Sequence, residues 1–170
     1  MSVILGSART SSYNLADQVS IQSYYTHSQG YWLGFKPKTN QLDLANAMKE
    51  LCANNNIGYS QAQRETAWDS WEYFGKSIAN INKRVYTDCS AGVRLCIRQA
   101  FNKVLPNFNT SNEPTVLKNS GLFEEPIKVT KSSQCTIGMV LCSPKKGHTV
   151  IVISTDEQVV NNTEVKVPDG

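Results

Sequence analysis

Apolar residues recur at three- and four-residue steps in several parts of the chain, which is the spacing of a helix that buries one face. The spacing predicts a helix over residues 40–52, a less regular helical region over 64–82 and a clear helix over 89–103. Asp88 directly precedes the last of these and is well placed to cap it. A fourth, short helix is expected over 114–119, inside a stretch that is otherwise rich in loops.

Short runs of β-branched and aromatic residues predict strands between and after these helices. Two runs lie near the N-terminus, around residues 19–25 and 31–35, and two lie near the C-terminus, over 137–142 and 148–153. The last two are separated by Ser-Pro-Lys-Lys-Gly, a turn sequence, and a further strand is expected over 158–161. Helices followed by an antiparallel meander predict an α+β fold, with N-terminal helices packed on a C-terminal antiparallel sheet.

The length of 170 residues suits one domain with one core. We assign residues 1–161 to a single domain and expect 162–170 to be an edge strand or the start of a linker. Hydrophobic residues make up 40% of the chain and charged residues 18%, an ordinary globular composition that excludes collagen-like, disordered and coiled-coil chains.

The charge pattern and the apolar runs exclude several classes of partner. The net charge is only +3, with no dense basic stripe, so nucleic acid is not an expected partner. The apolar runs are too short to span a bilayer, and the N-terminal apolar stretch is too short for a secretory signal. We therefore expect a protein made in the cytoplasm without a signal peptide and without a membrane partner.

Five cysteines are an odd number, and a chain of this length has enough core without disulfides, so reduced thiols are expected. Cys135, Cys142 and His148 form the nearest cluster of metal-binding types, but their spacing matches no zinc pattern. We expect no metal and no cofactor. Most of these cysteines are best interpreted as small buried apolar side chains.

Cys89 differs because it falls in the first turn of its predicted helix. A thiol there lies near the positive end of the helix dipole and near unpaired backbone N–H groups, and both favour the nucleophilic thiolate. At about 100° per residue, Cys89 shares a stripe with Val93 and Cys96. That stripe is expected to face the sheet, whereas Arg94 and Arg98 lie on the other side and are expected to face water.

A cysteine nucleophile needs a base, and the chain has two histidines. His27 lies in a polar loop and is interpreted as a solvated histidine. His148 opens an apolar strand and shares a face with Val150 and Val152, which favours a side chain held at the edge of the core. His148 is therefore the predicted base.

The base in turn needs a group that orients its second ring nitrogen. If the turn after residue 153 is centred on Ser154 and Thr155, the following strand places Asn161 directly opposite His148. A turn one residue later would place Thr163 there, and a bulge would favour Asn162. Asn161 is the residue that we select.

Together these motifs resemble the NlpC-type cysteine peptidases, papain-like enzymes that cut peptidoglycan peptides. The resemblance is carried by Asp-Cys-Ser-Ala at residues 88–91, Gly-His and a β-branched strand at 147–153, and the polar Asn161 on the next strand. The segments at 20–25 and 52–61 are similar to those of bacteriophage endolysin catalytic domains, the closer match. The chain departs from the family at Gly138-Met139, where Gly-Asp is common.

The resemblance implies a papain-like NlpC fold and a Cys89–His148–Asn161 triad that hydrolyses an amide bond of bacterial peptidoglycan. It also implies that Tyr59 lines the substrate site, and Asp88 and Ser90 are further candidates for substrate binding. Either a peptide-bond endopeptidase or a muramoyl-alanine amidase would fit. The resemblance further implies that the protein is a phage or prophage endolysin that acts on the cell wall outside the cytoplasm. A C-terminal wall-binding domain is a possible partner.

Three other classes of function remain open from the sequence, one of which is a zinc amidase that a chelator, and not iodoacetamide, would inactivate. An acyltransferase or transpeptidase would use the same three residues and differ only in the acceptor. A non-catalytic wall-binding module would keep Cys89 as a merely buried side chain, and its substitution would leave wall binding unchanged.

Overall fold

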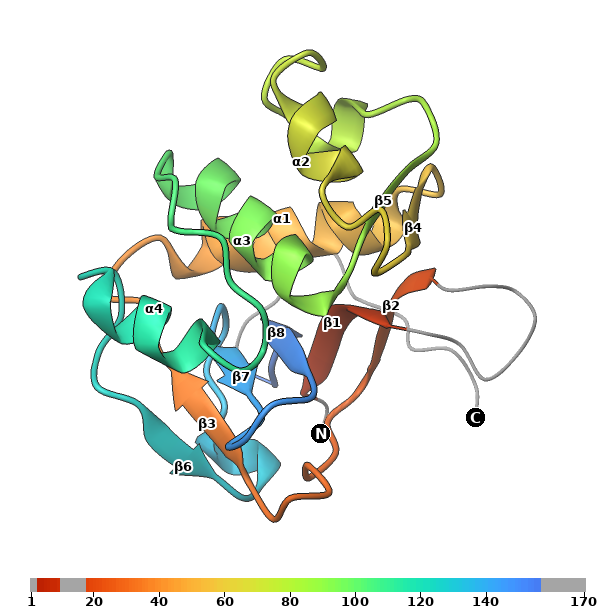
Figure 1. Cartoon of the computed structure of the whole chain (residues 1–170). Coiled ribbons are helices and arrows are strands. Elements are labelled where there is room, and N and C mark those ends of the chain that lie inside the picture. The colour runs from red at the N-terminus through yellow and green to blue at the C-terminus, as the bar shows by residue number, and fades with distance from the viewer. Residues whose placement is uncertain (1–2, 10–17, 157–170) are drawn as a thin grey trace.

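The computed structural model describes residues 3–9 and 18–156, which form one mixed sheet with helices packed against it (Figure 1). Within these ranges the sheet has eight strands in the order β5-β4-β2-β1-β8-β7-β3-β6. In chain order the strands are β1 (Ile4–Arg9), β2 (Gln18–Ser23), β3 (Trp32–Phe35), β4 (Ile57–Tyr59), β5 (Val85–Thr87), β6 (Ile127–Val129), β7 (Val140–Cys142) and β8 (Thr149–Ser154).

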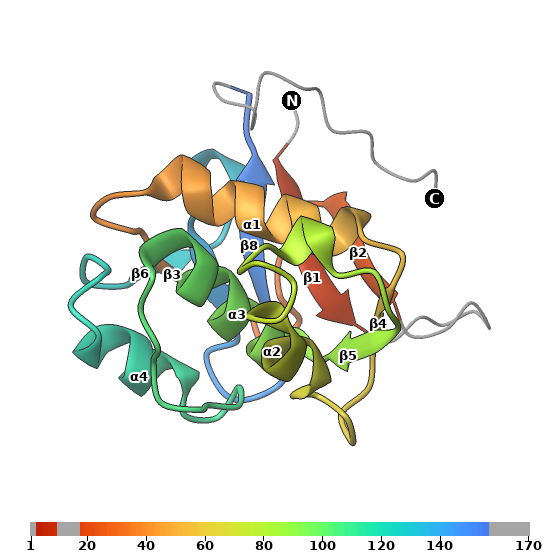
Figure 2. The ribbon, with the colours of Figure 1, turned by 90° about the horizontal axis from the view of Figure 1, so that it is seen from above.

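The helices are α1 (Gln41–Ala53), α2 (Thr66–Trp71), α3 (Cys89–Phe101) and α4 (Glu113–Asn119), with two short 3-10 turns at Ile78–Asn80 and Ser132–Gln134. The helices α1 and α3 contact each other, and both contact β1 and β8 in the middle of the sheet. Seen from above, α1 crosses over β8, and α2 lies beyond α3 on the side of β5 (Figure 2). The apolar stripes of α1 and α3 therefore close the main core against the sheet.

Alternation along the strands builds a second, smaller core on the opposite face of the sheet. On β8, Ile151 and Ile153 belong to the cluster under α1 and α3, whereas Val150 and Val152 belong to the cluster around Trp32. Both faces of the central strands are thus buried, and β8 is buried along its whole length.

The expected α+β class is confirmed, and the expected position of the sheet is wrong. Strands from the N-terminal half form much of the sheet, and β4 pairs with β5 in parallel. The predicted helices at 40–52, 89–103 and 114–119 correspond to α1, α3 and α4. The helical region at 64–82 is interrupted, because Gly75 and Lys76 adopt positive φ angles of 75° and 61° that end the helix.

The strand expected over 158–161 lies outside the described residues, whereas both described neighbours of β8 are known. The strand β8 pairs with β7 on one side and with β1 on the other, where Ile4 lies opposite Ser154. Within the described residues β8 therefore has a neighbouring strand on each side. Asn161 and its alternatives Asn162 and Thr163 lie outside the described residues, as do the predicted strand 158–161 and residues 162–170.

Arg94 and Arg98 do not face water as expected. The guanidinium of Arg94 stacks on the Trp68 ring at 3.7 Å, and its Nε donates a hydrogen bond to the Leu105 carbonyl. Arg98 stacks on Trp68 and Trp71. The tryptophans around α2 cover this face of α3, an arrangement that places cations over aromatic faces.

No helix in the described part of the chain is both long enough and apolar enough to cross a bilayer.

Candidate active site

A pocket of about 190 Å³ opens where α3 begins and β8 begins. It brings together the predicted nucleophile Cys89 and the predicted base His148. It also contains Tyr59, Asp88 and Ser90, the three residues expected to contact substrate. The remaining lining residues are Ala8, Gln61, Asn109, Thr110 and Gly147.

The ends of the strands explain why these residues meet. The strands β4 and β5 run in parallel with Tyr59 opposite Thr87, so both end at the same edge of the sheet. The chain then leaves β5 through Asp88 directly into Cys89 at the start of α3. His148 arrives from the other side, one residue before β8 begins.

Asp88 caps α3 as predicted, because its Oδ1 accepts a hydrogen bond from the Ala91 backbone N–H at 2.8 Å. Ser90 donates a longer hydrogen bond to the same oxygen, at 3.3 Å. The second carboxylate oxygen, Oδ2, receives the Nε of Arg64 at 2.6 Å. Both oxygens of Asp88 therefore already have partners within the protein, and its side chain is only 11% exposed.

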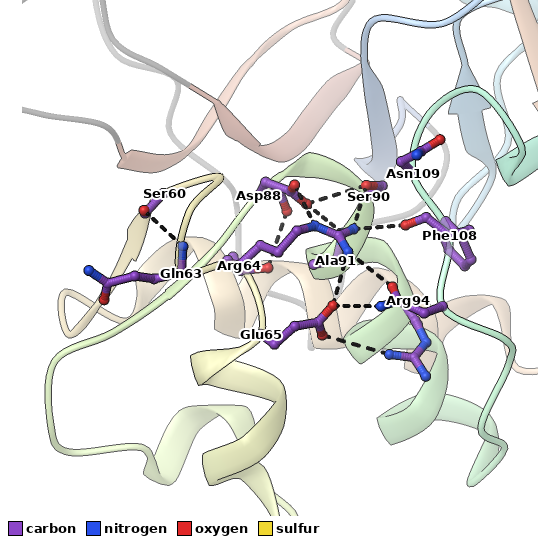
Figure 3. A network of polar contacts seen from close by, with 12 residues as sticks. Ser60, Gln63, Arg64, Glu65, Asp88, Ser90, Ala91, Arg94, Phe108 and Asn109 are labelled. Carbon is purple, nitrogen blue, oxygen red and sulfur yellow. Dashed lines mark hydrogen bonds and ion pairs between the residues drawn. The ribbon is translucent and has the colours of Figure 1, made fainter.

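Arg64 is the centre of this polar network, and sequence analysis missed it (Figure 3). Each of its five N–H groups donates one hydrogen bond; the acceptors are Asp88, Glu65, Asn107, Ser90 and the Phe108 carbonyl. Arg64 thus ties the start of α3 to the loop after α3. That loop carries Asn109 and Thr110 into the pocket wall.

The Cys89 thiol is half-buried, and its surroundings raise its pKa to about 12. Burial is the largest cause, followed by the nearby carboxylates of Glu113 and Asp88. Hydrogen bonds from the backbone of Thr149 and Ser90 act in the opposite direction. The backbone at the helix start therefore favours the thiolate, but burial and the nearby carboxylates outweigh this effect. The free protein holds Cys89 as a thiol.

The turn that precedes His148 is held in place by a side-chain clamp. The Ser143 hydroxyl accepts the His148 backbone N–H and donates to the His148 carbonyl, both at 2.7 Å. Nearby, Gln29 bonds the Lys145 N–H and the Lys146 carbonyl through its side-chain amide. The His148 backbone is therefore fixed by Ser143, and the turn before it is fixed by Gln29 from a distant part of the chain.

His27 belongs to this clamp and is not the solvated histidine that its polar loop indicated. It is 9% exposed, and its ring packs edge-on against Trp32. Its Nδ1 accepts the Gln29 N–H, so Nε2 carries the proton and donates to the Ser143 hydroxyl at 3.2 Å. Burial lowers the pKa of His27, which favours this neutral form.

Within the described residues, no group of three or more His, Cys, Asp or Glu side chains is placed to hold a metal ion.

Comparison with known proteins identifies the family. No curated protein and no solved structure matches the chain. The model of one family, described as the endolysin-like domain, matches residues 10–159 and so includes every lining residue of the pocket from Tyr59 to His148. The chain therefore belongs to the endolysin-like domain family.

Proposed function

We propose that this protein is a cysteine hydrolase that cleaves an amide bond of bacterial peptidoglycan. Membership of the endolysin-like domain family supports a cell-wall hydrolase of the phage endolysin type. The observation that carries the cysteine mechanism is the shared pocket, in which Cys89 at the first turn of α3 and His148 at the start of β8 line one cavity.

In the proposed first step, the Cys89 sulfur attacks the carbonyl carbon of the scissile amide while its proton passes to His148. A concerted transfer fits a thiol whose pKa is raised to about 12, because such a thiol is not ionised in advance. Backbone N–H groups at the start of α3, including that of Cys89, are suited to stabilise the negative charge on the carbonyl oxygen.

In the second step, the C–N bond breaks and His148 gives its proton to the leaving amine, which leaves a thioester on Cys89. A water molecule then attacks the thioester with His148 as the base, and the acid product and the free thiol are released. Asn161 is kept as the proposed orienting residue on the family resemblance, with Asn162 and Thr163 as alternatives.

The proposed peptide site is polar rather than apolar. Gln61, Asn109 and Thr110 supply amide and hydroxyl groups around the two reacting residues, and the half-buried Tyr59 completes the wall. Because Asp88 and Ser90 are held by Arg64, we assign them a supporting role in the pocket wall, and we assign substrate contacts to the other polar residues.

Turbidity clearing of purified bacterial walls tests the proposal. Wild type is expected to clear the suspension, and Cys89→Ala is expected to lose clearing while keeping its unfolding temperature. Cys135→Ala is the matched control, because Cys135 is another free thiol and does not line this pocket. Equal clearing by wild type and Cys89→Ala would show that Cys89 is not the nucleophile.

A further inference from the structure

A buried carboxyl group lies behind the pocket, and the proposed reaction does not use it. Glu113, the first residue of α4, has no exposed surface. Its Oε2 accepts the Thr149 hydroxyl at 2.7 Å and the Cys142 thiol at 3.3 Å. Among the described residues, its Oε1 has no hydrogen-bond partner. A fully buried carboxyl with one unsatisfied oxygen is costly unless it holds a proton, so its presence needs a reason.

Thr149 links this carboxyl group to both reacting residues. It directly follows His148 in the chain, and its backbone lies near enough to the Cys89 thiol to lower the pKa of that thiol. Its side-chain hydroxyl is the group that Glu113 holds. The Glu113 carboxyl therefore anchors the residue that lies beside the nucleophile and directly follows the base.

The two carboxyl groups near Cys89 differ in how their charge is balanced. Asp88 forms an ion pair with Arg64 at 2.6 Å, so its negative charge is compensated. For Glu113, no ion pair is found within the described part of the chain. An ionised Glu113 would therefore place an uncompensated negative charge behind the Cys89 sulfur.

We propose that Glu113 is a positioning residue that also sets the charge of the nucleophile. The space behind the pocket accommodates one negative charge, which lies either on Glu113 or on Cys89. The inference deepens the proposed function and rests on it. A protonated Glu113 permits Cys89 to lose its proton to His148. An ionised Glu113 holds Cys89 as a thiol.

The electrostatics agree with this geometry. Burial raises the pKa of Glu113 to about 8, and the Asp88 charge adds to the increase. Hydrogen bonds from Thr149 and Cys142 act against it. The titratable groups that face Glu113 are Cys142 on β7 and the Asp88–Cys89 pair at the start of α3, whereas Thr149 on β8 is neutral. Below about pH 8 the carboxyl is neutral, and Cys89 is free to react.

The test is the pH profile of Cys89 alkylation by iodoacetamide, followed by mass spectrometry of the peptide that contains Cys89. In wild type, the rate is expected to show a second inflection near pH 8, where Glu113 ionises and suppresses the thiolate. In Glu113→Gln this inflection is expected to disappear, and alkylation at about pH 9 should be about tenfold faster, the effect of roughly one pKa unit.

Glu113→Asp is the control that keeps the charge and shortens the side chain. It is expected to lower the unfolding temperature more than Glu113→Gln does and to keep the wild-type inflection. The inference would be overturned if Glu113→Gln and Glu113→Asp shifted the pH profile of alkylation equally. A Glu113→Gln profile that coincides with that of wild type would also overturn it. If Glu113→Gln does not fold, the wild-type protein is sufficient for the test. A wild-type alkylation profile that shows only one ionisation would overturn the inference.

Alkylation does not depend on cell walls, so the two proposals fail separately. If walls are cleared only when Cys89 is present but the alkylation profiles of wild type and Glu113→Gln coincide, the role of Glu113 is wrong and the proposed function stands. If the profiles differ but wild type does not clear walls, the coupling is real and the proposed function is wrong.

Discussion

Replacing Arg64 with alanine tests the network that fixes the start of α3. The substitution removes five hydrogen bonds at once and leaves the Asp88 carboxylate without its cation. The Asp88 side chain is only 11% exposed, so water replaces the lost donors incompletely. The loop that carries Asn109 and Thr110 also loses its attachment through the Phe108 carbonyl.

The expected cost follows from the burial of the pair. Breaking a buried ion pair on one side costs about 3–5 kcal/mol. Arg64 is 20% exposed, so partial solvation reduces the expected cost to about 2–3 kcal/mol. For a chain of this size, 1 kcal/mol corresponds to about 2–4 °C, so the unfolding temperature should fall by roughly 5–10 °C.

Thermal unfolding of Arg64→Ala, Asp88→Asn and the double variant measures this energy. The double variant should lose less stability than the sum of the two single variants, because the uncompensated charge is gone. Arg84→Ala is the control, since Arg84 is exposed and its loss should cost less than about 1 kcal/mol. An Arg64→Ala protein that unfolds within about 2 °C of wild type would refute the reasoning.

Three further predictions concern the residues around the pocket. Because the folded protein raises the pKa of Glu113 from 4.5 to about 8, it binds a proton that the unfolded chain has lost in this range. The unfolding free energy should therefore fall by up to about 1.4 kcal/mol per pH unit as pH rises from about 5 to about 8, and urea titrations should show a flatter dependence for Glu113→Gln. Ser143→Ala removes the clamp on the His148 backbone and should cost about 1–3 kcal/mol, with a larger fractional loss of wall clearing than a surface Ser→Ala variant; unchanged clearing would contradict the clamp. Gly138→Ala should cost at least about 2 kcal/mol in thermal unfolding, because Gly138 has a φ of 81° and a Cβ there would collide with the Gln41 carbonyl oxygen; a neutral effect would contradict the described backbone.

The helix cap and the two candidate reacting residues that share the pocket could be predicted because their signals are local. Asp88 and Cys89 are neighbours at a helix start, and His148 opens an apolar strand, so short-range pattern was sufficient to select them. The structure places Cys89 and His148 in one pocket, which is the geometry that the pattern required.

The supporting residues could not be predicted because their partners are distant in the chain. Arg64 lies 24 residues from Asp88, Glu113 lies 36 residues from Thr149, and His27 lies 116 residues from Ser143. A polar residue in a loop gives no sign of such a partner. The histidine in the polar loop was therefore interpreted as solvated although it is buried.

The strands β4, β5 and β6 are each three residues long, too short to show a two-residue alternation. The strand β1 contains Gly6 and Ser7, which weaken its apolar pattern. Without β1 in the prediction, β8 had a free edge, and residues 158–161 were assigned to it.

The central claim is that the Cys89 sulfur cleaves an amide bond in peptidoglycan. Its most direct test is mass spectrometry of the soluble fragments that wild type and Cys89→Ala release from purified walls. Wild type is expected to release fragments with new free amino and carboxyl termini, and Cys89→Ala is expected to release none. Identical fragments from both proteins, or fragments that carry only new sugar reducing ends, would contradict it.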